Sequence, residues 1–393
     1  MKKKIVSLLL TGVMAVGALA GCGGGQSIAD QQAAADSSTD SAEGGDSADS
    51  TVTMAAADEV DGTEITFWHS MGGVNGQAID ELVNRFNEEN ELGITVVSEY
   101  QGEYDDALNK LRSAQIGNMG ADLVQVYEIG TRFMIDSGWI IPMQEMIDQD
   151  NYDVSQIEPN LAAYYTIDDQ LYSMPFNSST PLMYYNVDMF EKAGITEIPT
   201  SLEGIEAIGD QLLNEGGASE VISLGIYGWF FEQFLGKQGL DYANNGNGRE
   251  AAATAVAFDE NGGAANILNA WKSLSDKGYA PIVGRGGDAG LADFSSGASA
   301  ITLGSTASLK QILQDVNGRF EVGTAYFPSI TDEDQGGVSI GGASLWALNN
   351  NDPKKLRATW EFVKFLISPE SQAYWNAQTG YFPVTVAAQE EQV

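Results

Sequence analysis

Apolar residues follow two different periods along the chain from Glu64 onward. Short apolar runs over residues 64–68, 94–99 and 122–126 are typical of strands, and apolar positions over 73–90 and 104–117 recur at helical spacing. A further helix is expected after the third run. Strands that alternate with helices predict an α/β fold in which a mainly parallel sheet carries helices on both faces.

The second half of the chain shows a break in this alternation. Residues 171–186 look extended, and we expect Pro175 and Pro181 to interrupt regular strand pairing there. We interpret this segment as a crossing into a second lobe. The other expected elements are helices over 201–214, 263–277 and 354–367, a strand over 300–303, a strand over 338–348 that returns to the first lobe, and a surface loop over 244–249.

Aromatic and polar residues gather where the predicted strands of the first lobe end. The three loops concerned are 68–70, 100–104 and 127–130, and ligands of open α/β sheets bind beyond the carboxyl ends of the strands. Aromatic faces stack on sugars and polyols, while short hydroxyl and amide groups bind their hydroxyls. For any single aromatic, core packing is the better explanation, and it is their clustering on one rim that favours a binding site. The residues that suit a binding site are Tyr104, Glu128, Ser178, Ser179, Trp229, Ser305 and Tyr381.

The N-terminus carries the pattern of a bacterial lipoprotein signal. Three lysines precede the apolar run 5–20, which is shorter than the roughly 20 residues of a membrane-spanning helix. The run ends in Leu-Ala-Gly-Cys, and Cys22 is the only cysteine of the chain. We therefore predict a signal peptide over 1–21, lipidation of Cys22, and an extracytoplasmic protein anchored to the cell membrane. Residues 22–62 are predicted to be a disordered acidic linker.

Charge and composition exclude several functions. The chain has 19 Lys and Arg against 55 Asp and Glu, a formal net charge of −36, so nucleic acid is not an expected partner. One cysteine and one histidine exclude a disulfide framework and a Cys-rich or multi-His metal site. Histidine-dependent catalysis would require His69, which has no acidic neighbour in sequence. A pair of carboxylates for glycoside hydrolysis stays open.

Six motifs resemble those of a known family, the extracellular solute-binding proteins of carbohydrate-type ABC importers. They are Phe67–Met71, Gln125–Gly130, Pro175–Pro181, Tyr184–Asn186, Ile340–Trp346 and Thr379–Pro383. The resemblance covers about residues 64–385. Within the family, the motifs most resemble those of members that bind sn-glycerol-3-phosphate and its diesters.

The resemblance implies a two-lobed, hinged fold of the periplasmic-binding-protein type II class, similar to maltose-binding protein. It implies no catalysis and no cofactor or metal, only a ligand held between the lobes. Its ligand positions correspond to Tyr104, Glu128, Ser179, Ser305, Gly342 and Tyr381, to which we add Ser178, Trp229 and His69 as expected ligand contacts. A tryptophan pair of the family is matched by Trp229 but not by its neighbour Phe230.

The resemblance also sets the expected domains and partners. The first lobe is expected over 63–177 and 337–385, the second over 178–336, and a tail over 386–393. Family members carry a phosphate-pairing arginine in a later segment, so we expect the second lobe to be incomplete at its C-terminus. A monomer that delivers its ligand to an ABC permease is expected. The alternatives are an oligosaccharide ligand, an extracellular glycosidase and a purely structural surface protein.

Overall fold

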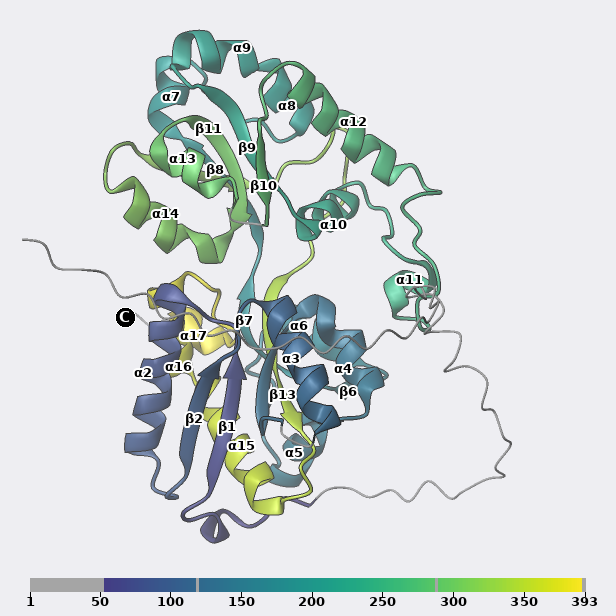
Figure 1. The fold of residues 1–393 in the computed structure, drawn as a ribbon, viewed down its shortest axis with the longest axis vertical. Coiled ribbons are helices and arrows are strands. Elements are labelled where there is room, and N and C mark those ends of the chain that lie inside the picture. The colour runs from purple at the N-terminus through teal and green to yellow at the C-terminus, as the bar shows by residue number, and fades with distance from the viewer. Residues whose placement is uncertain (1–52, 118–119, 287–288, 391–393) are drawn as a thin grey trace, which may run out of the picture. The chain divides into compact units, whose positions relative to one another are not determined.

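A computed structural model describes residues 53–117, 120–286 and 289–390 of the chain (Figure 1). The predicted signal peptide, Cys22 and most of the predicted linker lie outside these residues. Within the described part, no helix combines the length and apolar character needed to cross a membrane.

A first sheet forms the centre of what we call the first lobe. Its strands run in the order β2-β1-β3-β13-β4, and β7 also pairs with β13. The strands are β1 (Glu64–His69), β2 (Thr95–Tyr100), β3 (Leu123–Tyr127), β4 (Ile140–Ile141), β7 (Met174–Ser179) and β13 (Gly341–Leu348). The helices are α2 (Gly73–Glu89), α3 (Tyr104–Ile116), α4 (Thr131–Ser137), α5 (Met143–Asp150), α6 (Pro159–Tyr165), α15 (Pro353–Leu366), α16 (Pro369–Thr379) and α17 (Val386–Glu390), with the 3₁₀ turns η1 (Ala57–Glu59) and η2 (Glu128–Gly130) and the hairpin β5 (Thr166–Ile167) and β6 (Gln170–Leu171).

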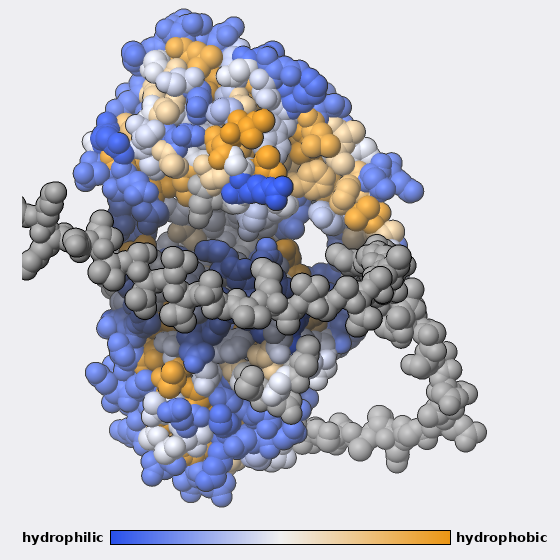
Figure 2. Space-filling model, in the orientation of Figure 1, coloured by the Kyte–Doolittle hydropathy of each residue, from blue (hydrophilic) through white to orange (hydrophobic). Residues whose placement is uncertain are grey.

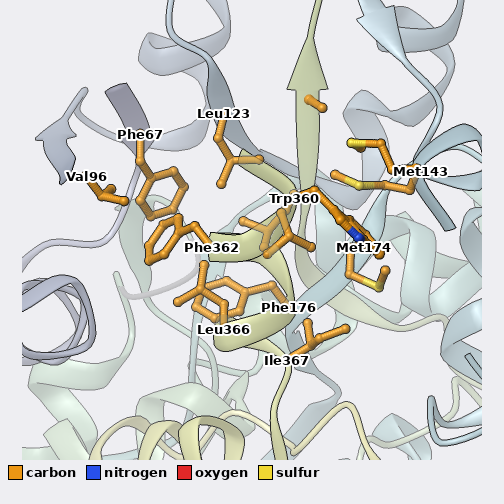
Figure 3. Packing of buried hydrophobic residues seen from close by; sticks show 14 of the residues in the cluster. Phe67, Val96, Leu123, Met143, Met174, Phe176, Trp360, Phe362, Leu366 and Ile367 are labelled. Atoms are coloured by element: carbon orange, nitrogen blue, oxygen red, sulfur yellow. The ribbon is translucent and has the colours of Figure 1, made fainter. Parts of the chain in front are cut away.

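Alternating side chains of the first sheet supply two cores. Leu123 and Leu345 belong to the core under α2, α15 and α16, while Val124 and Trp346, one residue further along, belong to the core under α3 and α4. Figure 3 shows the larger core, where the rings of Phe67 and Phe362 meet at 5.6 Å. Because successive side chains of a strand point to opposite faces, helices on both faces are needed to bury them.

A second sheet, in the order β10-β9-β11-β8-β12, forms the second lobe. Its strands are β8 (Pro181–Asn186), β9 (Glu220–Ile226), β10 (Ile282–Arg285), β11 (Ser299–Ser305) and β12 (Val322–Tyr326). Its helices are α7 (Val187–Lys192), α8 (Leu202–Ala207), α9 (Gly209–Gln211), α10 (Gly228–Lys237), α11 (Asn244–Gly248), α12 (Gly263–Asp276), α13 (Leu291–Ser296) and α14 (Leu309–Val316), with the single turns η3 (Leu212–Gly216) and η4 (Thr306–Ser308). The predicted crossing is confirmed, because β7 and β8 belong to different sheets.

The prediction of a mainly parallel sheet is only partly right. β1 pairs in parallel with β2 and β3, but β13 runs antiparallel to β3, β4 and β7. The physical reason is that β13 enters the first sheet from the second lobe, at the edge where the parallel strands end. The expected effect of the prolines on strand pairing is confirmed. The register of β7 against β13 shifts between the Asn177–Ala343 and Pro175–Ser344 pairs, and Pro181 is the first residue of β8, where pairing passes to the second sheet.

Two predicted boundaries need correction. Residues 53–62 were expected in a disordered linker, yet Met54 and Val60 are buried in the first-lobe core. Residues 386–393 were expected to be a tail, yet Val386–Glu390 forms α17, in which Ala388 is buried. In both places an apolar side chain reaches the core from a segment that is polar on average.

Two predicted elements of the second lobe take a different form. The helix expected over 201–214 is divided into α8, α9 and η3. The loop expected over 244–249 contains α11, whose residues 245–247 have φ between 56° and 59°, so it is a left-handed turn. Asparagine and glycine tolerate this conformation better than other residues.

The visible surface is mostly hydrophilic. Figure 2 shows polar and charged residues over most of the visible face, interrupted by smaller apolar patches.

Candidate functional site

The first sheet brings most of the predicted ligand contacts to one edge. The parallel strands β1, β2 and β3 end there, at His69, Tyr100 and Tyr127. Antiparallel β13 begins at the same edge, because its residue Ala343 pairs with Tyr127. The residues that this edge gathers are His69, Tyr104, Glu128, Ser178, Ser179, Gly342 and Tyr381.

Ser178 and Ser179 are placed by two strand pairings. In β7 they pair with Gly342 and Gly341 of β13, so both still belong to the first sheet. Ser178 also forms a bridge with Phe382, which sets Tyr381 beside it. Only glycine suits position 342, because φ is 95° and a Cβ atom would overlap the carbonyl oxygen of Asn177.

The second lobe contributes Trp229 and Ser305 to this region. A Cβ atom on Gly341 would meet the ring of Trp229 and the hydroxyl of Ser179, so the indole lies against the start of β13. Ser305 ends β11 and caps η4, with its Oγ accepting a hydrogen bond from the Ala307 N–H. The predicted contacts from both lobes therefore lie close to the strand crossings.

Two carboxyl groups of this region have raised pKa values. Burial, and then the charge of Glu232 on α10, raise the pKa of Glu128 from 4.5 to about 8, and Glu128 is only 6% exposed. Burial also raises the pKa of Glu232 to about 7. Among the described residues, the lysines and arginines form their ion pairs with other carboxylates. Glu128 is therefore mostly protonated at neutral pH, and can donate a hydrogen bond as well as accept one.

These pKa values predict a loss of thermal stability as the pH rises from 6.5 to about 8. The folded chain retains protons on Glu128 and Glu232 that the unfolded chain has already released above about pH 4.5, so raising the pH favours unfolding. Burial lowers the pKa of His69 to about 4, so below pH 6.5 the unfolded chain binds a proton that the folded chain does not. There His69 makes the stability rise with pH, which opposes the effect of the two glutamates. Melting temperatures of the wild type and of Glu128→Gln/Glu232→Gln across this range test the prediction. Parallel curves for the two proteins would contradict it.

Two other predicted contacts are largely packed. His69 is 4% exposed and accepts a hydrogen bond from the Met71 N–H at Nδ1. Tyr104 stacks on Tyr127, with ring centroids 5.3 Å apart. Burial, followed by Tyr381, raises the pKa of Tyr104 well above its ordinary value, so its hydroxyl stays protonated. A direct contact between His69 and a ligand stays a prediction.

A cavity of about 680 Å³ lies next to this edge rather than over it. Ser178, Ser179 and Thr180 line it together with Ile340, so both strand crossings border the cavity. Its other walls come from α6, α16 and α17. The cavity shares only Ser178 and Ser179 with the predicted ligand contacts, because it lies on the side of β7 that faces these helices.

Several residues of the region were not predicted from the sequence. The guanidinium of Arg249 donates to the Tyr164 carbonyl oxygen at 2.9 Å and lies 5.0 Å from its ring centroid. Burial and the charges of Glu128 and Glu232 raise the pKa of Tyr164, while Arg249 opposes them. Arg249 gave no sequence signal, because it lies in an exposed polar loop far along the chain. No group of three or more His, Cys, Asp or Glu suited to a metal occurs among the described residues.

Comparison with known proteins gives consistent results. A family model described as bacterial extracellular solute-binding protein matches residues 81–393. The sn-glycerol-3-phosphate-binding periplasmic protein UgpB of Salmonella typhimurium is 36% identical over 336 residues, which are 84% of this chain and 76% of that protein. The corresponding protein of Yersinia pestis is 33% identical over 334 residues, 84% of this chain and 75% of that protein.

Solved structures agree with the predicted two-lobed fold. UgpB of Mycobacterium tuberculosis in complex with glycerophosphocholine is 25% identical, with a TM-score of 0.73 and 83% of each chain covered. The maltose-bound MalE3 of T. maritima has a TM-score of 0.71 at 16% identity, with 84% of this chain and 83% of that chain covered. The GacH receptor of Streptomyces glaucescens, solved unliganded and with acarbose, has a TM-score of 0.69 at 21% identity, with 84% and 81% covered. The fold is thus maltose-binding-like, and the chain belongs to the bacterial extracellular solute-binding proteins.

Proposed function

We propose that this chain is the solute-binding protein of an ABC importer and captures sn-glycerol-3-phosphate or a glycerophosphodiester between its two lobes. It holds the ligand without altering it and passes it to a membrane permease. The observation that carries the proposal is the gathering of Tyr104, Glu128, Ser179, Gly342 and Tyr381 at one sheet edge. The relatives named for glycerol phosphate support the choice of ligand.

The electrostatics of the edge are compatible with a phosphorylated polyol. A protonated Glu128 does not repel a phosphate, and it offers both a donor and an acceptor to glycerol hydroxyls. Hydroxyl groups of Ser179, Ser305 and Tyr381 add further polar contacts. Arg249 supplies a positive charge near Tyr164.

The location of the protein outside the cell is part of the proposal. Lipidation of Cys22 would anchor the mature chain, and the acidic segment that follows would hold the two lobes away from the bilayer. Metabolic labelling with a fatty acid, compared between the wild type and Cys22→Ala, tests the anchor. Equal labelling of the two proteins would rule it out.

An oligosaccharide is the second candidate ligand. Half-buried aromatic residues such as Trp229 and Tyr104 are suited to stacking on sugars, and GacH is a structural neighbour solved with acarbose. Titration calorimetry with glycerol-3-phosphate, its choline diester and maltose separates the candidates. Heat from maltose alone would exclude the phosphate ligand.

Replacement of Glu128 by alanine is expected to weaken ligand binding at least tenfold, equivalent to about 1.4 kcal/mol. The change removes the buried carboxyl group that binds the glycerol hydroxyls and leaves those hydroxyls without a partner. Calorimetry measures the affinity, and Glu191→Ala, an exposed acid on α7, is the control. Unchanged affinity in a folded Glu128→Ala protein would reject this role.

A further inference from the structure

Three hydrogen bonds, two of them buried and the third partly buried, connect the end of β1 to Tyr104. The Ser70 N–H donates to Gln125 Oε1 at 2.9 Å, and Gln125 Nε2 donates to Asn177 Oδ1 at 2.7 Å. Asn177 Nδ2 then donates to the Tyr104 hydroxyl at 2.9 Å. Gln125 is 1% exposed and Asn177 is fully buried, so water does not compete for the first two bonds. We call these residues the amide relay.

The direction of every bond in the amide relay follows from its first donor. A backbone N–H can only donate, so the Gln125 oxygen faces Ser70 and the Gln125 NH₂ group faces Asn177. The Asn177 oxygen is then occupied, and its NH₂ group faces Tyr104. The Tyr104 oxygen therefore accepts a hydrogen bond on this side, and its own proton points away from Asn177.

Tyr381 is a second hydrogen-bond partner of the Tyr104 hydroxyl. After burial, Tyr381 contributes most to the raised pKa of Tyr104, partly as a hydrogen-bond partner, whereas the bond from Asn177 lowers this pKa. An acceptor raises the pKa of a hydroxyl and a donor lowers it, so these signs agree with the direction set by the relay. Tyr381 is itself held by stacking on Trp375, with centroids 5.6 Å apart.

We propose that Gln125 and Asn177 are positioning residues that fix the Tyr104 hydroxyl as a hydrogen-bond donor toward the side occupied by Tyr381. In this arrangement the tyrosine pair still presents one proton to the ligand, and a phosphate or hydroxyl oxygen can accept it. This proposal rests on the proposed function, which puts a ligand oxygen at Tyr104 and Tyr381.

Gln125→Met tests the relay without touching Tyr104 and without adding a charge. The substitution removes the hydrogen bond that orients the Asn177 amide, so Asn177 no longer determines the direction of the Tyr104 hydroxyl proton. We expect glycerol-3-phosphate, the probe, to bind about fivefold more weakly, which corresponds to one hydrogen bond. In a Tyr104→Phe background, which has no hydroxyl to orient, Gln125→Met should cause no further loss. A merely structural role would weaken binding equally in both backgrounds, and that result would overturn the proposal.

Asn87→Leu is the matched control, because Asn87 also makes two hydrogen bonds, both to the Val96 backbone, on the far end of α2. Its affinity should equal that of the wild type. A second measurement needs no ligand: in tyrosine-labelled protein, the Tyr104 ring Cζ resonance should move in Gln125→Met and stay in place in Asn87→Leu. An unmoved resonance would overturn the relay. If the wild type binds neither glycerol-3-phosphate nor its choline diester, the proposed function fails. The Tyr104 Cζ resonance would still show whether Gln125 orients the Tyr104 hydroxyl, because that measurement needs no ligand.

Discussion

Replacement of Gly342 by alanine is expected to lower the free energy of unfolding by about 3 kcal/mol and to weaken ligand binding more than tenfold. The residue has φ 95°, which strains any side chain, and the added Cβ would overlap the Asn177 carbonyl oxygen. It would also lie 3.2 Å from the Ser178 Cα. Strand β7 must therefore shift, and Asn177 and Ser179 shift with it. Urea unfolding and titration calorimetry measure the two effects.

Gly138→Ala is the matched control for this prediction. Gly138 also has a positive φ, of 67°, but a Cβ atom there would meet nothing within 4 Å. It should lose only about 1 kcal/mol, the cost of the left-handed conformation alone. Equal losses in the two variants would show that the close approach of β13 to β7 does not matter.

Replacement of Asp150 by alanine should lower the free energy of unfolding by about 3 kcal/mol. Asp150 ends α5 and accepts hydrogen bonds from Arg357, Trp360 and Lys364 of α15, at 2.8–2.9 Å. Burial would raise its pKa, but the bonds from Lys364 and Trp360 and the nearby cations lower it to about 2. Removal of the Asp150 carboxylate leaves the partly buried Arg357 and Lys364 with Glu361 as their remaining ion-pair partner.

Urea unfolding at neutral pH measures this loss, and Asp148→Ala serves as control. Asp148 is an exposed residue of the same helix, so its removal should change stability by less than about 0.5 kcal/mol. The contribution of Asp150 should be complete above about pH 3.8 and disappear as the pH falls toward 2, because its pKa is lowered in the folded chain. An Asp150→Ala protein as stable as the wild type would contradict the prediction.

The sequence predicted the parallel part of the fold well, because local patterns determine it. Helices α2, α3 and α15 begin and end within a few residues of the predicted bounds. Asp352 shows why: it caps α15 by accepting from the N–H groups of Lys354 and Lys355, and Pro353 starts the helix. The direction of β13 was not predicted, since it depends on where the chain returns from the second lobe.

The candidate site was predicted only where its residues lie in recognisable motifs. Gln125 and Asn177 stand inside two of these motifs, but their roles depend on a hydrogen bond between strands that are 52 residues apart. Arg249 and Glu232 could not be predicted, because their positions near Tyr164 depend on how the second lobe folds. A local pattern thus finds the strand ends, and only tertiary contacts show which side chains meet there.

The link between β7 and β8 consists of a single residue, Thr180. Its N–H donates to Thr306 Oγ1 and its carbonyl accepts from the Thr306 N–H, and the proline that follows restricts its backbone to extended conformations. This link therefore has almost no torsional freedom. Residues 327–340, the other connection, contain no helix or strand. Any swing of one sheet against the other would therefore have to change the backbone on either side of Thr180 and within residues 327–340.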